Sequence, residues 1–319
     1  MYSKVVATGS FIPSNFLTNE DLEKRVDTSD EWITTRTGIK SRPVMDDDMT
    51  VPDMAYNAAQ DAVKSLQAKD PNFNVEEIGL IICATTTSSS MFPSCACQVQ
   101  GRIGIKDCIS FDVAAACSGF VYALSVADKF IKTGTVKKAL VIGADALSKT
   151  CDPLDRSTII LFGDAAGCFI LEASEQAGII STHLHANNEH AEILTLDNKQ
   201  FKAESHLQMQ GNAVFRLAVA ELANVVTETL EANNMDKSEV DWLVPHQANI
   251  RIIAATAKKL DLPMDRVILT IEKHGNTSAA SIPTAFDSAV KENKFQSGDI
   301  ILLEAFGGGM TWGSALIKY

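Results

Sequence analysis

The chain contains 319 residues, with 28 Lys and Arg residues against 40 Asp and Glu residues, and its formal net charge at pH 7 is −12. Hydrophobic residues make up 46% and charged residues 21%, which is typical of a globular protein with a sizeable core. The acidic excess excludes a nucleic-acid binder, which needs a basic face. No apolar run approaches the ~18 residues of a membrane-spanning helix, and Gly9, Ser10 and Pro13 interrupt the amino-terminal segment too early for a signal peptide. We therefore expect a soluble protein.

The seven cysteines indicate a reducing compartment. Their number is odd, their spacing forms no disulfide framework, and a core of this size needs no cross-links. We therefore expect the protein to be cytoplasmic. Cys95 and Cys97 lack the second cysteine pair or the histidines of a zinc site, so no metal is expected.

Strands and helices alternate along the chain, which predicts an α/β fold with helices packed on sheets. Residues 18–21 have the pattern of a capping box and predict the start of a short helix. The strands expected in the first half are 4–8, 79–84, 109–114, 138–144 and 166–173. The longer helices expected there are 52–68, 93–103 and 118–132.

The same order of elements recurs in the second half. Its expected strands are 178–185, 240–244, 266–271, 299–305 and 311–318, and its expected helices are 212–232, 248–260 and 278–292. Corresponding positions lie at nearly constant offsets: Ile81 to Leu243 is 162 residues, Val141 to Leu302 is 161, and Cys117 to Asn276 is 159. This pattern predicts an internal duplication with two domains, 1–174 and 175–319.

Cys117 follows a predicted strand and a turn of small residues, immediately before an apolar helix. A thiol at a helix amino terminus faces the positive end of the helix dipole, which favours the nucleophilic thiolate. The apolar surroundings are equally typical of a buried, unreactive cysteine, since cysteine is among the most buried residue types. This segment alone leaves both interpretations open.

Three further segments place polar groups or backbone amides after predicted strands. His246 follows strand 240–244, at the edge where α/β sheets place their sites, although a loop histidine can also be structural. Asn276 either caps helix 278–292 or belongs to a site with Cys117, its counterpart in the repeat. The glycine turn 307–309 could supply an oxyanion-hole amide. Because two-fold pseudosymmetry would bring these junctions together, we interpret Cys117, His246 and Asn276 as one catalytic site.

Several short segments occur in an order that is typical of one family. They are 30–32 (DEW), 35–39 (TRTGI), the region around Cys117, 151–153 (CDP), 244–249 (VPHQAN), 274–278 (HGNTS) and the final glycine turn. Through them the sequence resembles, over its whole length, bacterial β-ketoacyl-[acyl-carrier-protein] synthase III of the thiolase superfamily. The resemblance implies a duplicated thiolase-like fold in five layers, αβαβα, and a homodimer. It also implies initiation of type II fatty acid synthesis from acyl-CoA and malonyl-[acyl-carrier-protein], without a cofactor.

The resemblance also implies a role for each matching residue. Cys117 would accept the acyl group, with His246 and Asn276 as partners, and the backbone amides of Cys117 and Gly308 would form the oxyanion hole. Phe92 would shape the acyl pocket from across a dimer. Coenzyme A would be bound by Thr28, Trp32, Arg36, Arg156, Gly211, Phe215, Ala248 and Asn249. The carrier protein would be bound by Gln247, Ala248, Asn249, Ile250, Arg251, Lys258 and Lys259.

Other functions are less consistent with these residues. Hydroxymethylglutaryl-CoA synthase and biosynthetic thiolases have an acid or a second cysteine where this chain has Asn276. Papain-like hydrolases share the order Cys-His-Asn, but the glycine- and tryptophan-rich context of their cysteine is absent here. The intact set of three residues argues against a catalytically silent relative. Ser118, Ser157 and Met310 depart from residues common in the family, which leaves the preferred acyl primer open.

Overall fold

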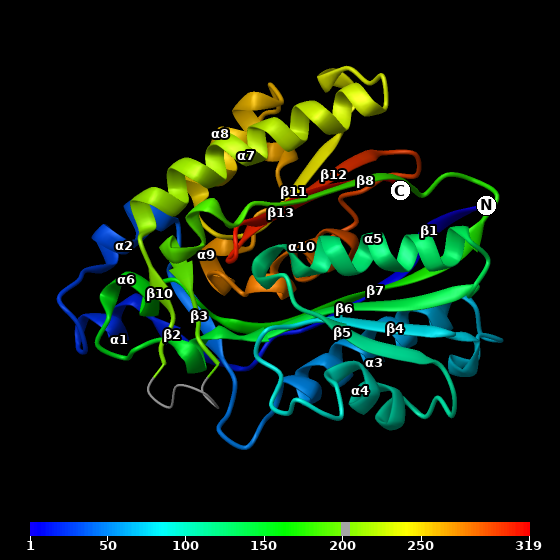
Figure 1. Ribbon diagram of the computed structural model, residues 1–319, viewed down its shortest axis with the longest axis horizontal. Coiled ribbons are helices and arrows are strands. Elements are labelled where there is room, and N and C mark those ends of the chain that lie inside the picture. The colour runs from blue at the N-terminus through cyan, green and yellow to red at the C-terminus, as the bar shows by residue number, and fades with distance from the viewer. Residues whose placement is uncertain (199–204) are drawn as a thin grey trace.

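The computed structural model describes residues 1–198 and 205–319, which form five alternating layers of helices and sheets (Figure 1). Two helices, α5 (Gly119–Lys132) and α10 (Ser281–Lys291), lie between the two main sheets. The outer face of the first sheet is covered by α3 (Val51–Lys69) and α4 (Cys95–Ile103), and that of the second by α7 (Gly211–Ala232) and α8 (Ile250–Lys259). The predicted five-layered α/β fold is confirmed.

The two main sheets have the same strand order. In the first sheet the order is β1 (Tyr2–Phe11), β7 (Asp164–Ser174), β6 (Lys138–Ala146), β4 (Leu80–Ala84) and β5 (Ile109–Val113). In the second it is β8 (Ile179–Ala186), β13 (Thr311–Lys318), β12 (Ile300–Gly307) and β11 (Trp242–Pro245). In the first sheet β6 pairs in parallel with β4, and in the second β12 pairs in parallel with β11. Strands β7 and β13 are antiparallel to both of their neighbours. The predicted boundary at residue 174 falls between β7 and β8, and the division into two domains stays a prediction.

The structural repeat has one main offset. Four pairs of elements begin 162 residues apart (281 − 119), namely β4 and β11, β6 and β12, α5 and α10, and the 3₁₀ turns Ala116–Ser118 and Ser278–Ala280. By this offset the counterpart of Cys117 is Ala279. The predicted correspondence between Cys117 and Asn276 is therefore wrong by three residues, since Cys117 lies inside the turn Ala116–Ser118 whereas Asn276 lies two residues before the matching turn Ser278–Ala280 and after a short helix, α9 (Ile271–His274).

The strand predicted over 266–271 is also wrong. Only Val267 pairs with the second sheet, through a single bridge to Leu243 of β11. The Gln247 side chain accepts hydrogen bonds from the backbone N–H of Thr270 at 3.0 Å and of Ile271 at 3.2 Å. A side chain therefore satisfies backbone groups that a strand ladder would otherwise use, and the chain turns into α9.

The layer between the sheets is apolar because α5 and α10 bury most of their surfaces. Phe120 of α5, Phe169 of β7 and Phe286 of α10 pack against one another, with ring centroids 4.9 Å and 4.7 Å apart along the series. Such aromatic contacts contribute about 0.5–1.5 kcal/mol per pair beyond burial. This packed layer positions the amino-terminal ends of both helices, near which Cys117 and Asn276 lie.

Smaller elements complete the chain. Helix α1 (Asn19–Glu23) begins at the predicted capping box, in which Thr18 Oγ1 accepts from the Asp21 amide at 3.2 Å. The unpredicted elements are short: α2 (Asp30–Thr37), α6 (Arg156–Ile159), β2 (Asn15–Thr18), β3 (Ser41–Val44), β9 (Leu194–Thr195) and β10 (Gln208–Met209). Among the helices of the described residues, none combines the length and the apolarity needed to cross a bilayer.

Candidate active site

Cys117 lies in the 3₁₀ turn Ala116–Ser118 that connects the end of β5 to α5. Its neighbour Ala116 has a φ of +44°, a left-handed conformation that costs energy for any residue with a side chain. Gly307 of β12 packs directly against this turn, since a Cβ at position 307 would lie 2.8 Å from the Cys117 amide nitrogen. A strained turn held by close backbone packing fixes the thiol at one position.

Burial raises the pKa of the Cys117 thiol to about 12, although the Ser278 hydroxyl lowers it by donating a hydrogen bond to Sγ at 3.5 Å. The positive end of α5 was expected to favour the thiolate. In the free protein the cost of desolvating a thiolate is larger than this effect, and the thiol is therefore protonated at neutral pH. The proton has to leave during nucleophilic attack rather than before it.

This pKa predicts the pH dependence of alkylation. Because only the thiolate reacts and the pKa is about 12, the rate of Cys117 carboxamidomethylation should rise about tenfold per pH unit from pH 7 to pH 9. The measurement is iodoacetamide labelling followed by peptide mapping, which separates Cys117 from the half-buried Cys97 and Cys108. A rate that reaches a plateau below pH 8 would show that the helix terminus dominates after all.

His246 follows β11 and presents an imidazole that is 6% exposed. Its Nδ1 lies 2.7 Å from Ser281 Oγ, so that Nε2 is the nitrogen left for the cavity. Burial lowers the pKa of His246 to about 3, because the interior disfavours the imidazolium. The ring is therefore neutral at physiological pH and acts as a hydrogen-bonding group without a charge.

Asn276 is 5% exposed and its side-chain amide has a defined orientation. Its Oδ1 accepts a hydrogen bond from the Ser278 backbone N–H at 2.9 Å. This bond assigns the oxygen of the amide to the chain and leaves Nδ2 as the group that can donate elsewhere. A non-titrating donor suits a site where negative charge develops on an oxygen.

One cavity of about 250 Å³ is lined by all three predicted catalytic residues, Cys117, His246 and Asn276. Of the residues predicted to bind coenzyme A, the following also line it: Trp32, Arg36, Gly211, Phe215, Ala248 and Asn249. The Asn249 side chain forms hydrogen bonds within the protein at both polar atoms, since Oδ1 accepts from the Arg251 amide at 2.9 Å and Nδ2 donates to the Arg36 carbonyl at 3.0 Å. It joins α2 to α8 at the cavity wall.

Two cations lie close to one aromatic ring of this cavity, and of these two arginines only Arg36 is among the residues that line it. The Arg36 and Arg156 guanidinium carbons lie 4.8 Å and 4.9 Å from the centroid of the Trp32 ring. Such cation–π contacts hold positive charge beside a flat apolar surface, which suits a ligand with both phosphates and a base. Thr28 does not line the cavity, and its hydroxyl is buried without a hydrogen-bond partner in the described structure.

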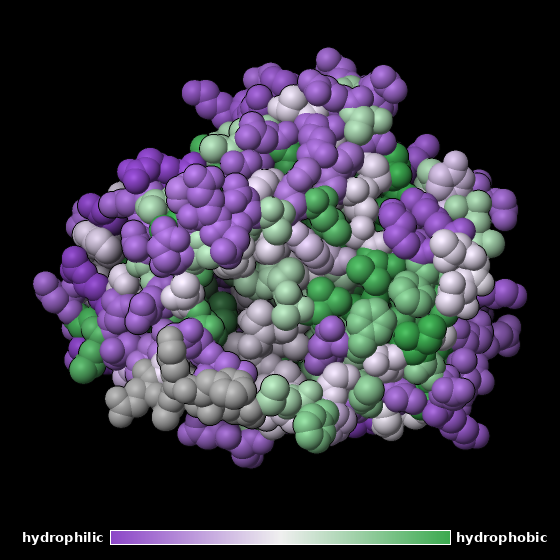
Figure 2. Space-filling model, viewed as in Figure 1, coloured by the Kyte–Doolittle hydropathy of each residue, from purple (hydrophilic) through white to green (hydrophobic). Residues whose placement is uncertain are grey.

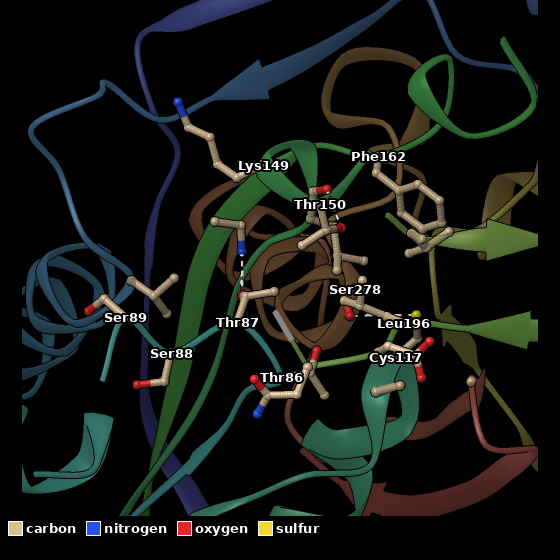
Figure 3. Close-up of a pocket in the computed structure, with 18 of the residues that line it drawn as sticks. Thr86, Thr87, Ser88, Ser89, Cys117, Lys149, Thr150, Phe162, Leu196 and Ser278 are labelled. Atoms are coloured by element: carbon tan, nitrogen blue, oxygen red, sulfur yellow. Dashed lines mark hydrogen bonds between the residues drawn. The ribbon is translucent and has the colours of Figure 1, made fainter. Parts of the chain in front are cut away.

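A second and larger cavity of about 640 Å³ reaches Cys117 from the other side. In Figure 3, Cys117 and Ser278 lie at one end of it, and Lys149, Ser88 and Ser89 lie at the opposite side. Gly308 lines it beside Cys117, as an oxyanion-hole role would need. Phe92 lines neither cavity of its own chain, and it is 87% exposed.

Residues of α8 form a basic face that begins at the rim of the first cavity. Arg251, Lys258 and Lys259 are exposed, and Arg251 also lies 5.0 Å from the ring of Phe215 at the cavity rim. Ile250 and Ala248 are half-buried. The prediction that Gln247 contacts a partner protein is wrong, because this side chain is 0% exposed and forms four hydrogen bonds inside the protein.

Three side chains next to the site had no predicted role. Ser278 and Ser281 contact Cys117 and His246 directly. Asp145 is buried at the end of β6, where its carboxylate accepts from Thr87 Oγ1 at 2.8 Å and from the Ala279 amide at 3.4 Å. It therefore ties the Ser278–Ala280 turn to the first sheet. Both serines lie in the HGNTSAAS segment, where their spacing from Asn276 was visible, but no pattern pointed to Asp145.

Comparisons with known proteins identify relatives across the whole chain. The sequence-family model for 3-oxoacyl-[acyl-carrier-protein] synthase III matches residues 111–188. The family model for the C-terminal part of the same proteins matches residues 230–319. The chain is 62% identical to β-ketoacyl-[acyl-carrier-protein] synthase III of Pasteurella multocida and 57% identical to synthase III 1 of Vibrio cholerae, with 100% of each chain covered. The crystal structure of 3-oxoacyl-[acyl-carrier-protein] synthase III from Aquifex aeolicus matches with a TM-score of 0.94 and 47% identity, covering 99% of this chain and 100% of that chain.

Proposed function

The chain belongs to the β-ketoacyl-[acyl-carrier-protein] synthase III family, the initiating condensing enzymes of type II fatty acid synthesis, and we propose that Cys117 is its acyl acceptor. In this proposal a short acyl group moves from acyl-CoA to Cys117 and is then condensed with malonyl-[acyl-carrier-protein]. The observation that supports it most is the single cavity that joins Cys117, His246 and Asn276 to the Trp32 and Arg36 entrance.

In the first half-reaction Cys117 Sγ attacks the thioester carbonyl carbon. The bond from that carbon to the coenzyme A sulfur breaks, and the departing thiolate takes the proton that Cys117 loses, so no external base is consumed. The Cys117 and Gly308 amides stabilise the tetrahedral oxyanion, where removal of a single donor typically costs about 10²–10³ in rate. Trp32, Arg36 and Arg156 hold the nucleotide end.

In the second half-reaction the malonyl group loses carbon dioxide, and negative charge moves onto its thioester oxygen. His246 Nε2 and Asn276 Nδ2 donate hydrogen bonds to that oxygen. The carbanion attacks the acyl carbonyl on Cys117, the bond from that carbon to Sγ breaks, and the released thiolate takes up one proton from solvent to restore the thiol. No metal or organic cofactor takes part, since the leaving group is a neutral gas.

The basic face of α8 is the proposed docking site of the acidic carrier protein. Lys258 lies seven residues, or about 10 Å along the helix, from Arg251 at the cavity rim. The positive charges on this face would attract an acidic partner and direct its bound malonyl group toward the cavity. Lys258 does not line that cavity, so it can contact the carrier protein without contacting coenzyme A.

Lys258→Glu is expected to raise KM for malonyl-[acyl-carrier-protein] about 5- to 10-fold, with the KM for acetyl-CoA unchanged. The two constants are measured by condensation and by transacylation assays. The matched control is Lys64→Glu, which reverses an exposed charge on α3 in the opposite outer layer. An equal increase in both KM values, or an equal effect of both variants, would contradict a docking role for α8.

We also propose that the protein is a homodimer. Strand β5 is the edge of the first sheet, and its Phe111 and Val113 are only partly buried, as are Val126 and Phe130 of α5. Figure 2 shows a hydrophobic area on this face, where Figure 1 places β5 and α5. An apolar edge strand invites pairing with a second copy. Phe92 also requires a second copy if it is to reach an acyl pocket.

A cytoplasmic location is proposed from the cysteines. All seven are free, and five of them are buried among apolar side chains, which is the pattern of a protein that never meets an oxidising compartment. Substrates that carry coenzyme A and a carrier protein would also be met in the cytoplasm.

The proposal is tested by intact-protein mass spectrometry after incubation with a panel of acyl-CoAs, followed by peptide mapping. A single acetyl group on Cys117 and formation of 3-oxobutanoyl-[acyl-carrier-protein] on addition of malonyl-[acyl-carrier-protein] are the expected results. Labelling by longer or branched primers only would retain the mechanism and change the substrate. Folded protein that takes up no acyl group would contradict the proposal.

A further inference from the structure

We propose that Ser281 is a positioning residue that keeps the proton of the neutral His246 ring on Nε2. The inference deepens the proposed function, because only this tautomer can donate from Nε2 to the malonyl thioester oxygen. It rests on the hydrogen bonds around Ser281, which is the first residue of α10.

The Ser281 hydroxyl has two hydrogen-bond partners. Its Oγ lies 2.7 Å from His246 Nδ1, and it accepts a hydrogen bond from the Gln247 backbone N–H at 3.3 Å. The amide of Gln247 occupies a lone pair and offers no acceptor. Among the hydrogen bonds recorded for the described residues, Nδ1 is therefore the only acceptor available to the hydroxyl proton.

The burial of this pair excludes the opposite arrangement. Ser281 is 1% exposed and His246 is 6% exposed, so water does not offer the hydroxyl an alternative acceptor. If Nδ1 carried the ring proton, it would donate to Ser281 Oγ and leave the hydroxyl proton unsatisfied in the interior, which is unfavourable. The satisfied arrangement has Ser281 donating to Nδ1 and Nε2 carrying the proton. Burial also lowers the pKa of His246 to about 3, which excludes the doubly protonated ring at neutral pH.

The duplicated fold shows that the hydroxyl is not required to start the helix. The element that corresponds to α10 in the first half is α5, which begins at Gly119 with no side chain at all. The first residue of α10 is a serine instead, and α10 belongs to the half of the chain that contains His246. Packing between the sheets keeps the first turn of α10, and with it the hydroxyl, at a fixed position.

Ser281→Ala is expected to lower kcat for condensation roughly 10- to 100-fold, with KM for malonyl-[acyl-carrier-protein] and the rate of acylation from acetyl-CoA little changed. The matched control is Thr284→Val, which removes another buried hydroxyl one turn later in α10 without touching His246. Ser281→Thr keeps the hydroxyl and should restore condensation. Equal loss of acylation and condensation in Ser281→Ala, with Thr284→Val unaffected, would overturn the positioning role.

The tautomer itself is read without an activity assay. In protein labelled with [¹⁵N]histidine, nitrogen NMR distinguishes a protonated from an unprotonated ring nitrogen, and His246→Asn assigns the resonances among the six histidines. The expected result for the wild-type protein is a proton on Nε2, and for Ser281→Ala a mixture of the two tautomers. A wild-type proton on Nδ1 would overturn the inference. Because the NMR measurement needs no turnover, its result is independent of the test of the proposed function. The tautomer inference can therefore be contradicted while acyl transfer is observed, and the reverse.

Discussion

Cys117→Ala is expected to abolish covalent labelling by acetyl-CoA and to lower the rate of product formation roughly 10³-fold or more. The reason is that, within residues 1–198 and 205–319, Cys117 supplies the only sulfur that lines both cavities. The variant also removes little volume from a turn that is held by Gly307 packing, so folding should be retained. The measurement is the mass of the intact protein after incubation with acetyl-CoA, together with condensation kinetics.

Cys151→Ala is the control that separates position from acidity. Burial raises the pKa of the Cys151 thiol to about 12, as it does for Cys117, but Cys151 donates to the Leu147 carbonyl at 3.4 Å and lines neither catalytic cavity. Cys151→Ala should therefore retain the acetyl adduct. An adduct that persists in Cys117→Ala and disappears in Cys151→Ala would show that Cys151, and not Cys117, is the nucleophile.

The sequence predicted the fold wherever an element is long and periodic. Helices α3, α5 and α7 and strands β1, β4, β6 and β12 lie within a few residues of the predicted ranges. The failure at 266–271 has a local cause, since the Gln247 side chain takes the hydrogen bonds of a strand, and the apolar residues are buried without one. The periodicity of apolar residues predicts which residues are buried, but it does not predict which group forms hydrogen bonds with the backbone N–H and C=O groups.

The site was predicted less completely than the fold. Cys117 and His246 each follow a strand that the structure contains, and the fold brings these two junctions together, whereas Asn276 lines the same cavity although the strand predicted before it is absent and α9 precedes it. Ser281 and Asp145 could not be assigned in this way, because their roles depend on contacts with residues more than 30 positions away. Gln247 was misassigned for a related reason, since it is fully buried while the three residues after it are half-buried and Arg251 is exposed.

The two polar atoms of Asn276 have an observed contact and a proposed role, and the two can be separated. Its Oδ1 anchors the Ser278 amide, where the backbone has a φ of +53°, and Ser278 in turn contacts Cys117. Its Nδ2 is the proposed donor to the enolate oxygen. Asn276→Ala removes both groups and can disturb the nucleophile, whereas Asn276→Asp keeps an acceptor for Ser278 and replaces the donor with a carboxylate oxygen.

Asn276→Asp is expected to retain acylation from acetyl-CoA within about threefold and to lower the rate of condensation about 10²–10³-fold at pH 7, in line with the loss of one oxyanion donor. An ionised Asp would also repel the enolate, which adds to the loss. Acylation is measured by intact-protein mass spectrometry and condensation by formation of 3-oxoacyl-[acyl-carrier-protein]. If Asn276→Asp and Asn276→Ala lose both half-reactions equally, the residue acts through the Cys117 turn and not as a donor. Loss of condensation alone in Asn276→Asp, with weaker acylation only in Asn276→Ala, would separate the anchor from the donor within one side chain.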